Sequence, residues 1–179
     1  MLKQTEAVLV IVDVQGKLAE LMHDRERLYK NLSILIQGIQ AMEIPVLWLE
    51  QYPKGLGPTI PEVADLLPDQ SPIAKTCFSG CGQPDFVEAL RAVGRKQVLV
   101  AGIEAHICVY QTVRDLLESG YDVEVAADAV SSRVPENRQI ALDKMVRAGA
   151  ELTSVEMALY ELLREAGTPA FKKILPLVQ

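Results

Sequence analysis

The sequence predicts an α/β fold in which a parallel sheet lies between two layers of helices. Short apolar segments rich in branched residues recur along the chain, as expected of strands that are buried on both faces. Longer segments with helical spacing separate them, and this alternation places helices on both sides of a parallel sheet. The 179 residues suit one domain with a large core, which we expect to span 1–179.

About six strands are expected from the apolar segments. Four of them are clear: AVLVIVD (7–13), PVLWLE (45–50), QVLVAGI (97–103) and DVEVAAD (122–128). Two weaker candidates complete the set, namely SPIAKT (71–76) and AELTSV (150–155).

The segments between the strands predict helices because their apolar residues recur every three or four positions. The segment 25–42 is one example, in which the residues on one face are Leu28, Leu32, Leu35, Ile36 and Ile39. Gly120 and Gly167 are typical of helix ends, and Pro135 suits a first helical turn. The other helices are expected over 84–94, 105–119, 135–148, 154–166 and from about residue 170 onward.

One long segment, 51–72, is rich in proline and shows neither pattern. Irregular segments of this length in compact domains usually serve function, for example as a pocket wall or a lid. A plain surface insertion is the alternative, since surface loops tolerate added length.

The composition argues against several classes of partner. The net charge is −6 and the pI is about 5.0, whereas nucleic acids and anionic membranes are bound by basic faces. No apolar run approaches the ~20 residues of a membrane span, and Asp13 comes too early for a secretory signal. We therefore expect a cytoplasmic protein with a small-molecule substrate and without a nucleic-acid or membrane partner.

The cysteines are expected to be free thiols. Cys77, Cys81 and Cys108 are odd in number and follow no secretion signal, which disfavours a disulfide framework. A structural zinc site usually takes four Cys or His ligands, and the chain adds only His23 and His106 to these three. We expect neither a metal nor another cofactor.

Three polar residues stand where ligands bind in such folds, just beyond the carboxyl ends of strands. Asp13 ends the first strand, Lys75 follows the apolar run PIA, and Cys108 lies five residues past the strand 97–103. Each has a structural alternative: a cap or turn residue for Asp13, a solvated lysine for Lys75 and a packing residue for Cys108.

Together these residues form a workable nucleophilic set. The start of a helix lowers the pKa of a thiol, and its free N–H groups can hold an oxyanion. Lys75 can stabilise the thiolate by its charge, while Asp13 can take the thiol proton and later deliver it to a leaving amine. His106 is expected to point away from Cys108, and the rival nucleophile Cys77 lacks a helix start.

The chain resembles the isochorismatase-like cysteine hydrolases over essentially its whole length. The resemblance rests on VIVDVQ (10–15), AKTCFS (74–79) and AGIEAHICV (101–109), in this order. EQYPKGLGPT (50–59) and DAVSSR (128–133) are similar to motifs of the isochorismatase domain-containing subgroup. The resemblance implies a Rossmann-like three-layer α/β/α fold with strand order 3-2-1-4-5-6.

The resemblance also implies a triad of Asp13 as acid and base, Lys75 as its cationic partner and Cys108 as nucleophile. It implies a cis peptide bond between Ile103 and Glu104, with the amides of Glu104 and Cys108 facing the substrate oxygen. Residues expected at the pocket, each with a packing or solvation alternative, are Gln15, Gln51, Tyr52, Leu56 and Phe78. Residues expected in turns and caps are Asp128, Ser131 and Ser132.

Two positions depart from the family pattern. Nicotinamidases of the superfamily bind a metal through an Asp and histidines after the second strand, whereas LEQYPKGLGP (49–58) contains no histidine. Many relatives have an aromatic residue shortly after the first motif, where this chain has Leu18. Neither zinc nor nicotinamide is therefore expected.

The predicted function is hydrolysis of a small amide-like substrate through a thioester on Cys108. One alternative is vinyl-ether hydrolysis of isochorismate, which protonates a carbon and needs no thiol nucleophile. The other is a non-catalytic interaction module, because fold and motifs do not by themselves establish activity. Relatives commonly form dimers or larger assemblies, so a homo-oligomer is expected, and the tail 171–179 can pack on a neighbour or on its own sheet.

Overall fold

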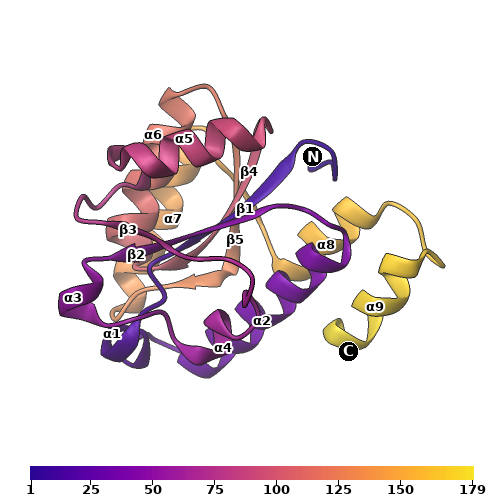
Figure 1. The fold of residues 1–179 in the computed structure, drawn as a ribbon, viewed down its shortest axis with the longest axis horizontal. Helices are drawn as coiled ribbons and strands as arrows, with labels where there is room; N and C mark the ends of the chain where they lie inside the picture. Colours follow the sequence, from indigo (N-terminus) through magenta and orange to yellow (C-terminus); the bar gives the residue numbers. More distant parts are fainter.

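The computed structural model describes residues 1–179 and shows a six-stranded sheet with helices on both faces (Figure 1). All neighbouring strands are parallel, in the order β3-β2-β1-β4-β5-β6, which confirms the predicted fold class and strand order. The strands are β1 (Ala7–Val12), β2 (Val46–Gln51), β3 (Ile73–Lys75), β4 (Gln97–Ile103), β5 (Asp122–Ser131) and β6 (Glu151–Thr153).

Two groups of helices cover the sheet (Figure 1). One face carries α2 (Arg25–Ala41), α4 (Pro61–Ala64) and α8 (Val155–Leu163), and α9 (Pro169–Val178) packs against α2 and α8. The other face carries α5 (Pro84–Val93), α6 (Tyr110–Glu118) and α7 (Pro135–Arg147). Two short helices follow the carboxyl ends of β1 and β2 and contact each other, α1 (Gly16–Glu20) and α3 (Pro53–Leu56).

Strand β1 shows why the buried strands are continuously apolar. Its six residues are all buried and alternate between two hydrophobic cores. Leu9 and Ile11 pack in the core that contains α2 and α8, whereas Val8 and Val10 pack in the core that contains α5 and α6. Burial on both faces therefore explains the uninterrupted apolar run.

Some expected boundaries differ from the structure. β5 continues to Ser131, beyond the expected end at residue 128. The helix expected over 105–119 is divided into a π-helical turn, Ala105–Val109, and α6. The segment 51–72 is not wholly irregular, because it contains α3 and α4, which are four residues long and begin with a proline. Helices of a single turn are too short to show apolar periodicity.

The C-terminal tail packs on its own chain. Helix α9 lies against α2 and α8, and Ile174 is buried in the core that these helices share. The tail therefore covers helices rather than the sheet. None of the helices combines the length and the apolar character that crossing a bilayer requires.

Candidate active site

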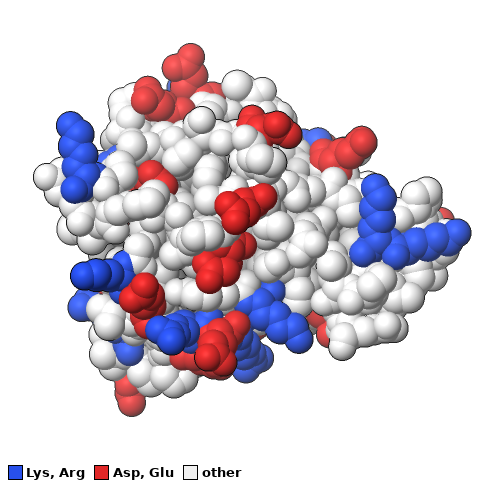
Figure 2. Space-filling view, turned by 60° about the horizontal axis from the view of Figure 1, so that its bottom comes forward, with Lys and Arg blue, Asp and Glu red and all other residues white.

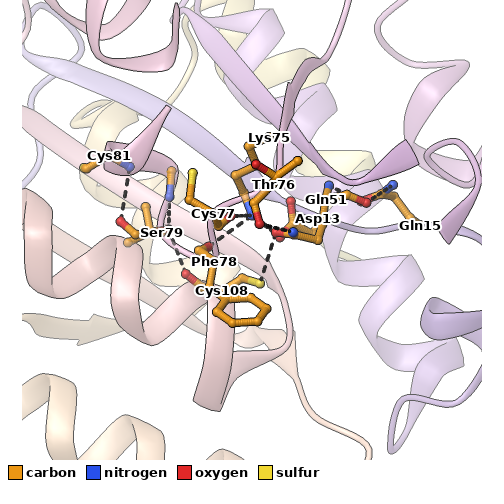
Figure 3. A network of polar contacts seen from close by, with 12 residues as sticks. Asp13, Gln15, Gln51, Lys75, Thr76, Cys77, Phe78, Ser79, Cys81 and Cys108 are labelled. Carbon is orange, nitrogen blue, oxygen red and sulfur yellow. Dashed lines mark hydrogen bonds and ion pairs between the residues drawn. The ribbon is translucent and has the colours of Figure 1, made fainter. Parts of the chain in front are cut away.

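The three side chains of the predicted nucleophilic set meet at the carboxyl edge of the sheet (Figure 3). Asp13 directly follows β1, Lys75 ends β3, and Cys108 lies in the π turn that follows β4. The Lys75 Nζ and Asp13 Oδ2 atoms are 2.7 Å apart, and all three residues are buried. A buried ion pair beside a thiol is an arrangement that can move a proton.

The Lys75 ammonium is surrounded by hydrogen-bond acceptors. It donates to Asp13 Oδ2 at 2.7 Å and to Gln51 Oε1 at 2.6 Å. It also donates to the carbonyl oxygens of Cys77 at 3.2 Å and Phe78 at 3.0 Å. Lys75 is therefore the direct partner of Asp13, and it acts on the sulfur of Cys108 only through its charge.

The environment of the Cys108 thiol favours its protonated form. Burial, and after it the charge of Asp13, raises the pKa of Cys108 to about 12 against the smaller opposing effect of Lys75. The pKa of Cys108 is therefore raised, and the prediction that its place at a helix start leaves it lowered is wrong. The reason is that the sulfur lies in a buried π turn beside a carboxylate, which outweighs any benefit from the start of the following helix.

Asp13 is placed to accept the proton of this thiol. Burial raises the pKa of its carboxyl group, while the charge and the hydrogen bond of Lys75 act in the opposite direction. Oδ2 is bonded to Lys75, whereas Oδ1 is buried and has no hydrogen-bond partner. A carboxylate oxygen without a donor, close to a protonated thiol, is an available base.

The turn that carries Cys108 is tied to its surroundings. At its start, the Glu104 carbonyl accepts a hydrogen bond from the Ile107 amide at 3.0 Å. Further along, the Cys108 carbonyl accepts from the Thr112 hydroxyl at 2.7 Å, and the same hydroxyl accepts from the Gly80 amide at 2.9 Å. These bonds fix the nucleophile relative to the segment that follows β3.

The backbone just before this turn has two special features. The peptide bond between Ile103 and Glu104 is cis, as the resemblance implied. Gly102 has a φ of 122°, and a Cβ at this position would lie 2.1 Å from the carbonyl oxygen of Val12. Only glycine allows β4 to approach β1 so closely, one residue before Asp13.

Several other polar residues at this edge bond away from the triad. His106 Nδ1 lies 2.9 Å from Ser132 Oγ, in agreement with the prediction that it points away from Cys108. Asp128 accepts a hydrogen bond from the Val155 amide at 2.8 Å at the start of α8, and Ser131 donates to a backbone carbonyl. Asp128 therefore has a cap role, as the sequence predicts, whereas Ser131 lies at the end of β5 and its hydroxyl bonds to the carbonyl of His23.

Of the residues expected at the pocket, Gln15 and Gln51 belong to the hydrogen-bond network (Figure 3). The Gln15 amide group donates to the carbonyls of Gln51 and Gly57 and accepts from the Gln51 amide, so its polar atoms are occupied by the backbone. Gln51 reaches the reacting atoms, since its Oε1 lies 4.0 Å from Cys108 Sγ. Gln15 therefore positions Gln51, and Gln51 faces the site.

The other expected pocket residues, Tyr52, Leu56 and Phe78, are exposed. The two aromatic residues are 54% and 55% exposed, respectively. Tyr52 lines a cavity of about 290 Å³ together with Lys75 and Thr76. Leu56 and Phe78 do not line this cavity, so of the three residues only Tyr52 forms part of its wall.

Two buried carboxylates with specific partners, Glu50 and Glu104, were not predicted from the sequence. Glu50 Oε1 accepts from the amide and the hydroxyl of Thr59, both at 2.7 Å. Glu104 is paired with Arg133, with Nη2 to Oε1 at 3.0 Å. The motifs EQYPKGLGPT and DAVSSR contain three of these residues, but a motif does not reveal which side chains touch.

The cysteines are free, as predicted. Burial raises the pKa of Cys81 to about 11. Cys77 contributes its carbonyl oxygen rather than its sulfur to the contacts of Lys75. The structure shows no group of three or more His, Cys, Asp or Glu side chains arranged to hold a metal ion.

Comparison with known proteins places the chain in a family. The model of the Isochorismatase domain matches residues 7–157. The chain belongs to the isochorismatase family. Isochorismatase domain-containing protein 2 of Xenopus laevis is 38% identical over 175 residues, covering 97% of this chain and 83% of that protein. The secreted isochorismatase effector Isc1 of Phytophthora sojae is 37% identical over 178 residues, with coverage of 97% and 84%.

Solved structures of similar proteins share the fold of this isochorismatase-family chain. The MAR1 ribonuclease of Caenorhabditis elegans has a TM-score of 0.93 at 38% identity, over 99% of this chain and 91% of that one. YcaC of Pseudomonas aeruginosa, solved with hexane-2,5-diol and covalent acrylamide, has a TM-score of 0.92 at 29% identity, over 98% and 90%. YcaC of Escherichia coli, described as an octameric hydrolase of unknown specificity, has a TM-score of 0.90 at 28% identity, over 98% and 91%.

Proposed function

We propose that this isochorismatase-family protein is a cysteine hydrolase that cleaves the C–N bond of a small amide-like substrate. The observation that carries the proposal is the buried cluster in which Lys75 Nζ lies 2.7 Å from Asp13 Oδ2, Cys108 Sγ lies 4.0 Å from Gln51 Oε1, and the charge of Asp13 acts on the thiol. Asp13, Lys75 and Cys108 then act as base, cationic partner and nucleophile.

The first half of the reaction forms a thioester. Cys108 Sγ attacks the substrate carbonyl carbon while the thiol proton moves to Asp13. The Asp13 carboxyl group becomes neutral beside Lys75, and the negative charge develops on the substrate oxygen. The amides of Glu104 and Cys108 then hold the oxyanion. When the C–N bond breaks, Asp13 returns the proton to the leaving nitrogen.

The second half releases the acid. Asp13 takes a proton from water, whose oxygen attacks the thioester carbon. The C–S bond breaks and the proton on Asp13 returns to the sulfur, which restores the starting state. Throughout, Lys75 counteracts the effect of burial on Asp13, so that the carboxyl group can still lose its proton.

The relatives support this assignment. A cysteine nucleophile in this fold would account for the covalent acrylamide in P. aeruginosa YcaC, since acrylamide reacts with thiolates. The E. coli YcaC is called a hydrolase and is octameric. By analogy we also propose that this chain forms a homo-oligomer.

RNA cleavage is the second candidate, favoured by the 38% identity with the C. elegans MAR1 ribonuclease. The charge of this chain opposes it: the net charge is −6, and Figure 2 shows acidic and basic side chains interspersed on the face in view. Lys75, which is the only cation hydrogen-bonded to Asp13, is buried and committed to that pair.

The experiment is a screen of small amides, carbamates, isochorismate and RNA against the wild type, Cys108→Ala and Cys81→Ala, read by product formation and intact mass. The proposal expects turnover of an amide or carbamate, with an acyl adduct in the wild type and Cys81→Ala but none in Cys108→Ala. Isochorismate or RNA consumed equally by Cys108→Ala would contradict the cysteine mechanism. Failure to detect turnover or adduct in any reaction would favour the interaction module.

A further inference from the structure

The residue that begins the nucleophile turn is held by a distant arginine. Glu104 directly follows β4 and is only 4% exposed, whereas Arg133, which follows β5, has a side chain that is 53% exposed. The backbone amide of Arg133 donates to Glu104 Oε2 at 3.0 Å. The side-chain Nε of Arg133 lies 3.1 Å from Glu104 Oε1 and 3.2 Å from Oε2. Its Nη2 lies 3.0 Å from Oε1.

These contacts between Arg133 and the Glu104 carboxylate, called the Arg133 clamp below, act on a residue whose backbone belongs to the site. The Glu104 carbonyl accepts hydrogen bonds from the amides of Ile107 at 3.0 Å and Val109 at 3.2 Å, on either side of Cys108. The Glu104 amide is the proposed oxyanion donor. A carboxylate held by three N–H groups has little rotational freedom, so Arg133 also restricts the backbone of Glu104.

The Arg133 clamp also affects the charge environment of Cys108. Cys108 is influenced by charged groups from three neighbouring elements: Asp13 after β1, Lys75 in β3 and Glu104 after β4. In addition, Glu50 in β2 acts on Asp13, and His106 in the turn itself is bonded to Ser132. The Glu104 carboxylate raises the pKa of Cys108, and Arg133 is the cation paired with that carboxylate.

We propose that Arg133 is a positioning residue for the nucleophile: through Glu104 it fixes the turn that presents Cys108 and offsets a negative charge that opposes the thiolate. This inference rests on the proposed function, in which Cys108 reacts. It assigns a role in that reaction to a residue that does not touch the reacting atoms and lies 29 positions from Glu104 in the chain.

The test measures the rate at which iodoacetamide alkylates Cys108 as a function of pH, by mass spectrometry of the Cys108 peptide. Arg133→Gln leaves the Glu104 charge unbalanced, so we expect the rate profile to move to higher pH and the rate at pH 8.5 to fall about three- to tenfold. Glu104→Gln removes that charge and should move the profile to lower pH.

Two further variants separate positioning from general damage. In the Glu104→Gln background, Arg133→Gln should change the rate less than twofold, because no charge is left to balance. Arg114→Gln on α6 removes the arginine of an ion pair whose carboxylate is exposed rather than buried, Arg114–Glu118 at 3.0 Å, and should leave the profile unchanged. Thermal melts of each variant report whether it is folded.

Equal profiles for Arg133→Gln and Arg114→Gln would overturn the inference, as would an undiminished effect of Arg133→Gln in the Glu104→Gln background. Alkylation does not require a substrate, so the two proposals can fail separately. A shifted alkylation profile without any acyl adduct would leave the Arg133 role standing and remove the hydrolase. Turnover with an unshifted alkylation profile would leave the hydrolase standing and remove the role of Arg133.

Discussion

Replacing Lys75 with methionine tests the buried ion pair on which the site is built. The side chains of Lys75 and Asp13 are 0% and 2% exposed, so Lys75→Met leaves a carboxylate in the interior without its cation. Breaking a buried pair in this way costs about 3–5 kcal/mol, because the remaining charge is neither solvated nor paired. In a chain of this size that corresponds to a melting temperature lower by about 6–20 °C.

The assay is urea unfolding at pH 7 with Arg114→Met as the matched control. Arg114 and Glu118 also form an ion pair, at 3.0 Å, but their side chains are 41% and 68% exposed, so its loss should cost less than about 1 kcal/mol. The double variant Asp13→Asn/Lys75→Met should recover part of the lost stability, since it removes the unpaired charge. Equal losses in Lys75→Met and Arg114→Met would refute the argument.

Three other features of the site can be tested by substitution, by pH and by alkylation. Gly102→Ala should destabilise the protein by about 3 kcal/mol or more, since its Cβ would lie 2.1 Å from the Val12 carbonyl oxygen. The control Gly94→Ala should cost about 1 kcal/mol, because Gly94 has a φ of 69° and open space around it. Similar melting temperatures for the two variants would contradict this prediction. Because the native pKa of Cys108 is raised to about 12 from 9.0, the native state holds the thiol proton more tightly, and its stability should fall as pH rises from 9 to 12. In Cys108→Ser the free energy of unfolding, measured by urea titration, should fall by about 1–4 kcal/mol less over this pH range than in the wild type. Parallel curves of unfolding free energy against pH for the two proteins would count against the raised pKa. At pH 7 iodoacetamide should alkylate Cys108 more slowly than a free cysteine in a peptide, and a faster reaction would show that the thiol is ionised.

The sequence predicts the strands and most helices because burial on both faces leaves a continuous apolar run, as in β1. It also predicts where Asp13, Lys75 and Cys108 come together, since the carboxyl ends of parallel strands share one edge. Helices α1, α3 and α4 were missed because helices of about one turn carry no periodicity.

The state of the thiol depends on information that the sequence does not contain. A cysteine near a helix start suggests a lowered pKa, but burial and the distance to Asp13 decide the sign, and both follow only from the folded chain. The pairing of Arg133 with Glu104 also could not be predicted from the sequence, because no spacing rule connects two residues that follow different strands. Gln15 was expected at the ligand and instead has its amide group bonded to backbone atoms.

In the proposed reaction Asp13 receives the thiol proton as Cys108 attacks, and this transfer can be tested by the rate at which acrylamide adds to Cys108 in the variant Asp13→Asn. The negative charge of Asp13 opposes a free thiolate, so a mechanism that starts from preformed thiolate would become faster when that charge is removed. Proton transfer to Asp13 predicts the opposite, an addition to Cys108 at least about tenfold slower than in the wild type by intact mass and peptide mapping. An equal or faster addition in Asp13→Asn would contradict proton transfer to Asp13.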